Sequence, residues 1–349
     1  MESLPDGDQP GARMKLTWES YPLRLREPLR ISRSTMAFRG AVRISLSDGE
    51  HTGHGEVVTS VHHRLDLPTI TAACETLAGP PALGGFPAIA AGGLGPVPPG
   101  VRAAVDAALL DLRGKQAGMP VYALLGLPAA TAVVTAYTIG LVSPNDAATA
   151  ALGLAAGGFG VLKIKAGDQY DVARIAAVRR AAPGVRLWID PNGGWTPTET
   201  LRVLAECEQH RIDMVEQPVP PGAPDRLAWI SERTPIPVVA DEDAATEDDV
   251  DRLAGAVDGI NIKLAKCGGV TAALSLAAKA REHGLEIMLG CLVASSLGIA
   301  PAVHLAGLAR WIDLDGHLLL NDDPHTGIGG HGGTLRLSGE PGLGIRRKI

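Results

Sequence analysis

The chain has 349 residues, which is long enough for a large hydrophobic core and for two domains. Hydrophobic residues make up 46% of the sequence and charged residues 20%, a composition typical of a globular protein. The formal net charge is −6 and there is no polybasic run, which argues against nucleic acid as a partner. The four cysteines lie far apart without metal-type spacing, so we expect reduced thiols and a cytoplasmic protein.

One uncharged stretch, residues 287–309, is long enough to span a lipid bilayer. However, it contains Pro301, Ser295 and Ser296, and it begins at the spacing at which another β-strand is due. We therefore expect a buried strand followed by a buried helix, and no membrane partner.

The first part of the chain shows strand patterns. Residues 1–13 lack the apolar segment of a signal peptide, and we expect them to form a disordered tail. Apolar and polar residues alternate over 15–25 and 41–46, and again over 51–58 after a turn sequence at 47–50. These patterns predict an antiparallel meander of strands.

A helix is expected to complete this first unit. Residues 79–100 are rich in glycine and proline and carry no charge, so we expect a loop there. An apolar stripe at helical spacing then begins at Val101, and the sequence Gly-Met-Pro at 118–120 stops it. Together the meander and the helix predict an α+β capping domain over residues 14–125.

The rest of the chain repeats short apolar strands separated by helical patterns, at the spacing of one strand, one helix and two loops. The eight strand candidates are 135–140, 159–165, 186–190, 212–217, 236–241, 259–264, 286–291 and 311–315. They predict the α/β class with a (β/α)8 TIM-like barrel over residues 126–316. A doubly wound open sheet is the alternative, but its usual glycine fingerprint is absent. We expect the glycine-rich segment 317–349 to return to the capping domain.

Six charged side chains lie near the carboxyl ends of these strands, where the side chains of a barrel converge on one mouth. They are Lys163, Lys165, Asp190, Glu216, Asp241 and Lys263. Each acid alone could be a helix cap or a surface charge, but six charges in register predict a site. Three carboxylates on neighbouring strands form an oxygen cradle suited to Mg²⁺. No histidine or cysteine shares the spacing, which disfavours Zn²⁺.

The same residues suggest a reaction. A divalent ion bound to a substrate carboxylate stabilises the enediolate that forms when the neighbouring C–H bond loses its proton. Lys165 and Lys263 belong to the second and sixth strands, so they would flank the substrate, one removing a proton and the other returning one to the opposite face. We expect crowding by the ion and a second lysine to lower the pKa of the proton-carrying amines. Lys163 is expected to stay positively charged and not to move protons.

Five short motifs follow one another along the barrel: Lys-Ile-Lys at 163–165, Asp-Pro-Asn at 190–192, Glu-Gln-Pro at 216–218, Asp-Glu at 241–242 and Ile-Lys at 262–263. Together they resemble the enolase superfamily, muconate lactonizing enzyme subgroup, over residues 14–320. A lysine base with Mg²⁺ is the general pattern described for this superfamily. The resemblance implies a capped barrel, Mg²⁺ as cofactor, acids 190, 216 and 241 as its ligands, and lysines 165 and 263 as the acid–base pair.

The sequence Asp313-Leu314-Asp315 at the eighth strand is similar to the Asp-x-Asp motif of dipeptide epimerases, in which the two acids hold the α-ammonium group of a dipeptide. Alternate positions on a strand face the same side, which suits a clamp for an ammonium group. The resemblance therefore implies a Mg²⁺-dependent dipeptide epimerase. Such an isomerase moves the α-proton of the C-terminal residue of an L,L or L,D dipeptide.

Two positions depart from the relatives. Ala294 stands where many of them carry Glu after the seventh strand. In alanyl-glutamate epimerases an arginine of the cap loop reads the Glu side chain. An ungapped comparison puts Met36 in that place, with Arg33 or Arg39 as substitutes. This departure argues against strict selectivity for L-Ala-D/L-Glu. A dipeptide substrate with a less acidic second residue stays open.

Two other functions stay open. An N-acylamino acid racemase, an o-succinylbenzoate synthase or a muconate cycloisomerase would use the same fold, but their substrates carry no free ammonium group for Asp313 and Asp315. A catalytically inactive binding protein would not need Lys165 and Lys263 together with three metal ligands. Apolar helix faces outside the barrel predict a homo-oligomer.

Overall fold

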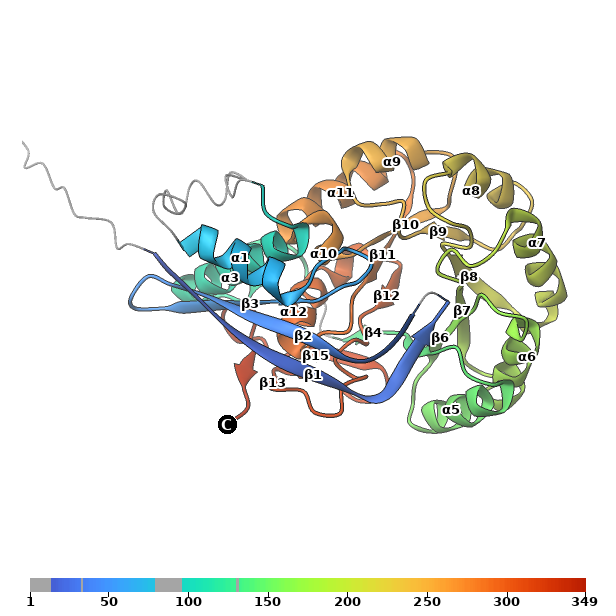
Figure 1. Ribbon diagram of the computed structural model, residues 1–349, viewed down its shortest axis with the longest axis horizontal. Coiled ribbons are helices and arrows are strands. Elements are labelled where there is room, and N and C mark those ends of the chain that lie inside the picture. Colours follow the sequence, from blue (N-terminus) through green and yellow to red (C-terminus); the bar gives the residue numbers. More distant parts are fainter. Residues whose placement is uncertain (1–13, 33, 79–95, 130–131) are drawn as a thin grey trace, which may run out of the picture.

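A computed structural model describes most of the chain, namely residues 14–32, 34–78, 96–129 and 132–349 (Figure 1). The expected tail at 1–13, Arg33 and most of the expected loop at 79–100 lie outside the described residues. In the part that is described, none of the helices combines the length and the apolar character needed to cross a bilayer.

The capping unit begins with three antiparallel strands, β1 (Lys15–Ile31), β2 (Ser34–Ser47) and β3 (Thr52–Val58), paired in that order. The alternation of apolar and polar residues predicted this meander. β1 and β2 are longer than expected because their pairing continues beyond an irregularity between Arg24 and Leu29 up to the tip of the hairpin.

Two helices, α1 (Leu67–Ala78) and α3 (Pro99–Ala117), share one hydrophobic core with this sheet. α3 is the expected helix, and it ends at Gly118, whose φ of 66° suits glycine. α1 has no counterpart in the expectations, although Asp66 caps its start by accepting from the Thr69 N–H at 2.9 Å.

Eight parallel strands form the barrel in sequence order. They are β5 (Tyr137–Ile139), β6 (Val161–Lys165), β7 (Arg186–Asp190), β8 (Ile212–Glu216), β9 (Val238–Ala240), β10 (Gly259–Ile262), β11 (Glu286–Gly290) and β12 (Trp311–Asp313). Each strand lies within two residues of its expected bounds, so the predicted (β/α)8 fold is confirmed. The first and last strands approach each other where the Ala136 N–H donates to the Ile312 carbonyl at 2.9 Å.

Helices surround the barrel on its outer side (Figure 1). They are α5 (Pro144–Ala156), α6 (Asp171–Ala181), α7 (Pro197–Glu206), α8 (Pro224–Ser231), α9 (Glu247–Leu253), α11 (Val270–Glu282) and α12 (Ser296–Val303). Ser143, Thr196 and Thr246 each cap a helix by accepting a hydrogen bond from the backbone three residues on. Short helical turns also occur at α4 (Val121–Leu124), α10 (Leu264–Cys267), Glu208–His210 and Ala306–Leu308.

Buried side chains fill the inside of the barrel, among them Trp188, Met214 and Trp311. They form a packed plug beneath the carboxyl ends of the strands, as in other barrels of this kind. Space for a ligand is therefore found above them, at the mouth.

The end of the chain forms short strands, β13 (His325–Thr326), β14 (Ile328–Gly329), β15 (Thr334–Leu337) and β16 (Arg346–Arg347), and β15 pairs with β4 (Val133–Val134). This segment also contacts the capping unit, because Leu320 bridges to Leu25 and Arg347 pairs with Glu19 at 2.8 Å. The division into domains at residues 125 and 316 stays a prediction.

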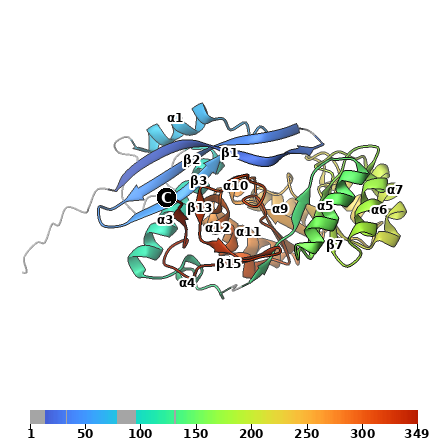
Figure 2. The ribbon, with the colours of Figure 1, turned by 90° about the horizontal axis from the view of Figure 1, so that it is seen from below.

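The β1–β2 hairpin reaches from the capping unit across the barrel toward β6 and β7, as both views show (Figures 1 and 2). Near its tip, the Ser32 hydroxyl lies 3.5 Å from the Asn192 carbonyl in the loop after β7. A Cβ at Gly167, after β6, would lie 3.0 Å from the Ser32 Cβ. The hairpin thus covers one side of the mouth at close range.

Candidate active site

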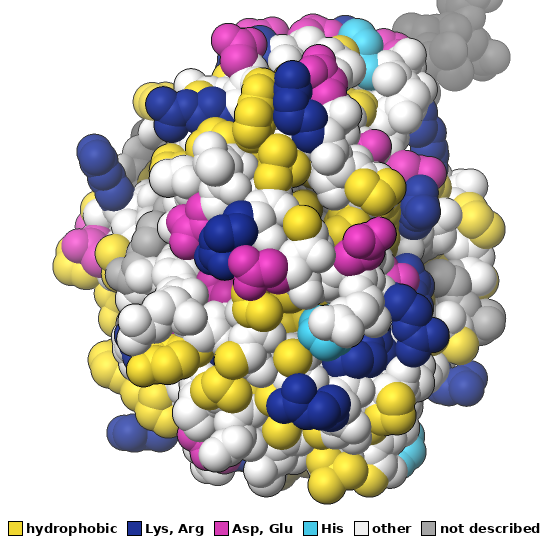
Figure 3. All heavy atoms as spheres, turned by 90° about the vertical axis from the view of Figure 1, so that its right-hand side faces the viewer, with side chains coloured by type: hydrophobic (Ala, Val, Ile, Leu, Met, Phe, Trp, Pro, Cys, Tyr) yellow, Lys and Arg dark blue, Asp and Glu magenta, His cyan; other side chains and the backbone are white. Residues whose placement is uncertain are grey.

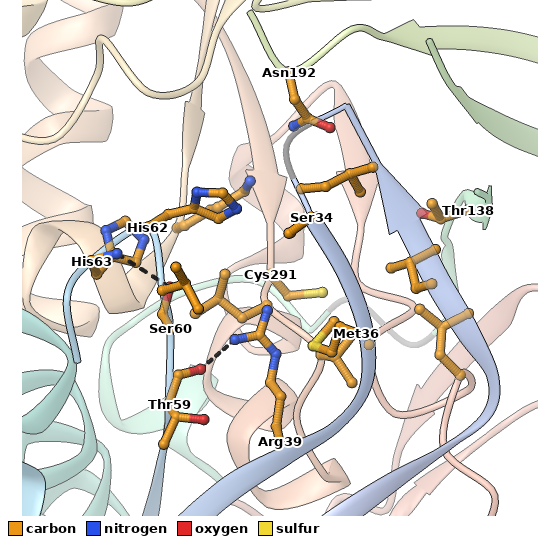
Figure 4. A pocket seen from close by; sticks show the side chains of 18 of the residues that line it. Ser34, Met36, Arg39, Thr59, Ser60, His62, His63, Thr138, Asn192 and Cys291 are labelled. Atoms are coloured by element: carbon orange, nitrogen blue, oxygen red, sulfur yellow. Dashed lines mark hydrogen bonds between the residues drawn. The ribbon is translucent and has the colours of Figure 1, made fainter. Parts of the chain in front are cut away.

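A cavity of about 920 Å³ lies between the capping unit and the barrel mouth (Figure 4). The barrel contributes charged and polar side chains to its floor, including Lys163, Lys165, Lys263, Asp313 and Asp315. The capping unit contributes a largely apolar wall, which includes Leu29, Ile31, Met36, Phe38, Val61 and Leu65. The cavity therefore offers ions on one side and hydrophobic surface on the other.

Lys163 is the centre of the charged floor. Its Nζ lies 2.6 Å from Glu216 Oε2, 2.7 Å from Asp313 Oδ2 and 3.0 Å from Asp190 Oδ2. The contact with Glu216 has the distance of an ion pair but not the alignment of a hydrogen bond, since Glu216 Oε2 has no hydrogen-bond partner. One buried ammonium thus holds together carboxylates from three different strands.

The other lysines pair with the remaining acids. Lys165 Nζ lies 2.6 Å from Asp190 Oδ2, and Lys263 Nζ lies 2.6 Å from Asp241 Oδ2. Lys266, which the sequence analysis did not single out, approaches the other oxygen of Asp241 at 2.7 Å. All six charges expected from the spacing therefore meet at the mouth.

The two lysines expected to move protons come from opposite flanks of the barrel. Lys165 ends β6 and Lys263 directly follows β10. Three strands, β7, β8 and β9, separate β6 from β10 on one side, and three others, β11, β12 and β5, lie on the other side. A molecule in the cavity would have one amine on each flank, with Asp190, Glu216 and Asp241 between them.

Burial and charge shift the acids in opposite directions. Burial alone would raise the pKa of Asp190, but the ammonium groups of Lys163 and Lys165 outweigh it and hold that pKa below its ordinary value. Burial, followed by the negative charge of Asp190, raises the pKa of Glu216 to about 7. The surroundings therefore favour the charged form of Asp190 and disfavour that of Glu216.

Acids dominate the surroundings of the Lys263 amine in this structure. Burial favours the neutral amine, but the charges of Asp241 and Glu216 outweigh burial and hold the pKa of Lys263 above its ordinary value. The expected lowering depends on a bound ion beside the lysines, and it stays a prediction. A neutral amine at this position requires that these carboxylates be neutralised by another cation.

Asp190, Glu216 and Asp241 are suitable ligands for a hard divalent cation, because they offer buried carboxylate oxygens on neighbouring strands. In the described part of the chain, no three His, Cys, Asp or Glu side chains stand close enough to hold a metal ion as they are. Lys163 and Lys263 lie between these carboxylates in this structure. The incompletely bonded oxygen of Glu216 and its raised pKa indicate that the cluster has capacity for added positive charge.

Asp313 and Asp315 both face the cavity, as their alternate positions predicted. Asp315 Oδ2 accepts a hydrogen bond from the Thr138 N–H at 2.7 Å, and Asp313 Oδ1 is buried without a hydrogen-bond partner. Burial, together with the charge of Asp313, raises the pKa of Asp315 to about 7. Two buried acids with incomplete partners form a place for a cationic group.

Some of the cap residues named from the sequence line the cavity. Met36 lines it, and so does Arg39, whereas Arg33 lies outside the described residues. His62 and His63 also reach the cavity from the loop after β3 (Figure 4). Burial and the charges of Lys263 and Lys266 lower the pKa of His63 to about 4.

Sequence reasoning missed several residues that hold the site in place. Asn261 donates to Glu216 Oε1 at 2.8 Å, and Gln217 accepts from the Asp241 N–H at 2.9 Å. Asn261 could have been found, because it is a polar residue two positions before Lys263 in a buried strand and so faces the same side. Lys266 could have been found too, since it lies one helical turn after Lys263.

A carboxylate does reach the segment at Ala294, although residue 294 itself is not acidic. Glu56 of β3 accepts a hydrogen bond from the Ser295 N–H at 2.8 Å and also contacts the Ser295 hydroxyl and Tyr21. Gly298 leaves the space for it, because a Cβ at that position would lie 2.7 Å from Glu56 Oε1 and 2.9 Å from the Ala294 Cβ. The acid thus comes from the cap.

The geometry can be set beside known proteins. The sequence profile of the family described as "Enolase C-terminal domain-like" matches residues 146–348, more than half of the chain. The chain belongs to the enolase superfamily. It is 37% identical over 350 aligned residues to a hydrophobic dipeptide epimerase of Roseobacter litoralis, covering 95% of this chain and 98% of the relative.

Solved structures of the superfamily share the whole architecture. The dipeptide epimerase of Enterococcus faecalis in complex with Mg and L-Leu-L-Tyr has a TM-score of 0.87 and 30% identity, covering 95% of this chain and 99% of that one. The N-succinyl Arg/Lys racemase of Bacillus cereus has a TM-score of 0.88 and 28% identity, covering 96% and 95%. Both reactions that the sequence left open, on free and on acylated amino groups, thus occur among proteins similar to this one.

A buried ion pair at the mouth should be essential for stability. In Lys266→Met, the Asp241 carboxylate and the Asn261 carbonyl lose a buried cation, so we expect the free energy of unfolding to fall by about 3 kcal/mol. Lys279→Met is the matched control, because Lys279 pairs with Asp251 on the surface, and it should cost less than about 1 kcal/mol. Urea denaturation in metal-free buffer measures both; equal losses would contradict the structural role of Lys266.

Proposed function

We propose that this protein is a Mg²⁺-dependent dipeptide epimerase. It would invert the α-carbon of the C-terminal residue of a dipeptide by moving a proton. The observation that carries the proposal is the placement of Lys165 and Lys263 on opposite flanks of one cavity, with the Asp313 and Asp315 pair at a third position on its rim. This arrangement provides two amines for two faces of a carbon and two acids for an ammonium group.

We assign the metal to Asp190, Glu216 and Asp241, because their oxygens are buried side by side at the ends of β7, β8 and β9. When bound, Mg²⁺ would supply positive charge that stabilises the negative charge developing on the substrate as its α-proton leaves. Lys163 adds a fixed positive charge beside the same carboxylates.

The chain's own groups then account for the inversion. A neutral amine on one flank accepts the α-proton, and the ammonium on the other flank donates a proton to the opposite face of the same carbon. The total number of protons is unchanged, and the configuration inverts. The buried floor keeps water from competing for the proton, since Lys163, Asp190 and Glu216 are almost wholly buried.

Asp313 and Asp315 favour a dipeptide over an acylated amino acid. An ammonium group would neutralise Asp315, whose pKa burial and the charge of Asp313 raise, and would add a second cation beside Asp313. An N-acyl group carries no charge and would leave Asp315 without a counter-ion, whereas Asp313 keeps Lys163. We therefore favour a dipeptide over an N-acylated amino acid as the substrate, although an N-succinyl amino acid racemase is among the similar structures.

The two-sided geometry gives a reciprocal exchange experiment. We expect the wild type, incubated with Mg²⁺ in D₂O, to exchange the α-hydrogen of both the L,L and the L,D dipeptide. Lys165→Ala and Lys263→Ala should each slow epimerisation by about 10²- to 10⁴-fold and keep exchange with one diastereomer only, and not the same one. Proton NMR measures both quantities. If both variants keep the same diastereomer, the lysines serve one face and the mechanism is wrong.

The role of the acid pair can be tested at Asp315, which does not contact Lys163. In Asp315→Asn, kcat/KM for a dipeptide with a free ammonium group should fall by about 10- to 100-fold, because one charge-assisted contact is lost. Turnover of the matching N-acetylated amino acid should not fall. The reverse pattern would favour the acylated substrate and reject the dipeptide.

We further propose that the protein acts in the cytoplasm, which its four unpaired cysteines support, and that it forms a homo-oligomer. Leu152, Tyr170 and Trp229 leave 60%, 50% and 38% of their surface exposed on the barrel's outer side. Figure 3, which looks at the side of the barrel helices, shows such apolar side chains between charged ones. We expect light scattering to give a multiple of the mass of one chain; the mass of a single chain would contradict the homo-oligomer. We also expect four free thiols in protein isolated without reductant; fewer thiols would contradict the cytoplasmic location.

A further inference from the structure

Arg39 differs from the lysines of the cavity in having no acid beside it. It projects from β2 into the cavity, where its Nη1 donates to the main-chain oxygen of Thr59 (Figure 4). Its Nε is buried and has no hydrogen-bond partner. Among the residues that the structure describes, no carboxylate pairs with this guanidinium, whereas Lys163, Lys165, Lys263 and Lys266 all contact carboxylates.

The guanidinium of Arg39 is half-buried, with its Nε wholly buried, and a cation held there without a counter-ion is costly to the fold. The cost is visible in its acidity, because burial lowers the pKa of Arg39 to about 10. A cation kept at this cost on the wall of a binding cavity is completed by a ligand that brings the missing negative charge. The planar guanidinium favours a carboxylate, which it can bind through two parallel hydrogen bonds.

The neighbours of Arg39 indicate which part of a dipeptide would reach it. Met36 and Cys291 lie beside its side chain in Figure 4. Cys291 directly follows β11, and burial, then the charges of Asp315 and Asp313, raise the pKa of its thiol. Cys291 thus lies near both Arg39 and the acid pair, on the β11 side of the mouth and away from Lys165 on β6.

In the proposed function the acid pair holds the α-ammonium group of the first residue. The side chain of that residue begins one bond from the carbon that carries the ammonium. It is thus the part of the substrate that starts next to Asp313 and Asp315 and can extend past Cys291 toward the cap. Its methylene groups would lie against Met36.

We propose that Arg39 binds the side-chain carboxylate of the N-terminal residue of the dipeptide, so that substrates beginning with an acidic residue are preferred. This inference rests on the proposed dipeptide epimerase function and names the substrate class of the same site. The apolar cap wall would remain for the side chain of the second residue, whose α-carbon is inverted.

Four dipeptides separate the effects of charge and position: Glu-Leu, Gln-Leu, Leu-Glu and Leu-Gln. We expect the wild type to turn over Glu-Leu about 10- to 100-fold better than Gln-Leu in kcat/KM, the size of one charge-assisted pair. Arg39→Gln should remove this ratio, because it lowers kcat/KM for Glu-Leu about 10- to 100-fold more than kcat/KM for Gln-Leu. Arg39→Lys should restore part of it, because the charge returns without the planar fork.

Arg43→Gln is the matched control, because Arg43 also lies on β2 but pairs with Glu19 at 2.7 Å outside the cavity. It should leave the Glu-Leu to Gln-Leu ratio unchanged. Equal losses on Glu-Leu and Gln-Leu in Arg39→Gln would overturn the inference, and so would an effect confined to the Leu-Glu and Leu-Gln pair. If the wild type exchanges the α-hydrogen of no dipeptide in D₂O, the proposed function itself fails; exchange without preference for acidic first residues rejects only the role of Arg39.

Discussion

The structure depends on the compensation of like charges at the barrel mouth. Parallel strands are about 4.8 Å apart, so acids at neighbouring strand ends lie within a few ångströms of one another in a medium with little water. Two buried carboxylates at that separation cannot both ionise without cations between them. Lys163 meets this requirement for three acids at once, and Lys263 with Lys266 meets it for Asp241. The lysines are therefore structural as well as chemical groups.

The fold divides the site between two units. The barrel places the ions, and the cap closes the cavity with apolar side chains and Arg39. Two acids of the capping unit join it to the barrel, because each accepts a hydrogen bond at the start of a barrel helix. Glu56 accepts from the Ser295 N–H at the start of α12, and Asp106 of α3 accepts from the Val270 N–H at 2.7 Å at the start of α11. Because these contacts lie away from the cavity wall, residues of the wall can differ between relatives while the cap keeps its position.

The eight strands and the positions of the six charges could be predicted because both follow local rules. An apolar run of strand length, followed by a helical pattern, repeats with a spacing that only a limited number of folds allow, and the strand ends of a barrel share one mouth. α1 escaped prediction although Asp66 marks its start, because its place depends on the sheet it packs against. The pKa of Lys263 could not be predicted because the sequence shows which charges are near, but not which atoms touch. The isolation of Arg39 is likewise a tertiary property, since an absence of acids around a side chain has no sequence pattern.

The charges of the cavity are arranged with a polarity that matches a dipeptide. Six acids on the barrel side, at positions 190, 216, 241, 242, 313 and 315, face four lysines, so carboxyl groups outnumber amines there. This surplus can be balanced by a metal ion near Glu216 and by an ammonium group near Asp315, the two acids whose pKa values burial and neighbouring acids raise. Arg39 places a positive charge on the opposite, cap side. A substrate can balance the negative charge of the floor with its ammonium group and the positive charge of the cap with its side-chain carboxylate. The reversed orientation would place like charges together on both sides.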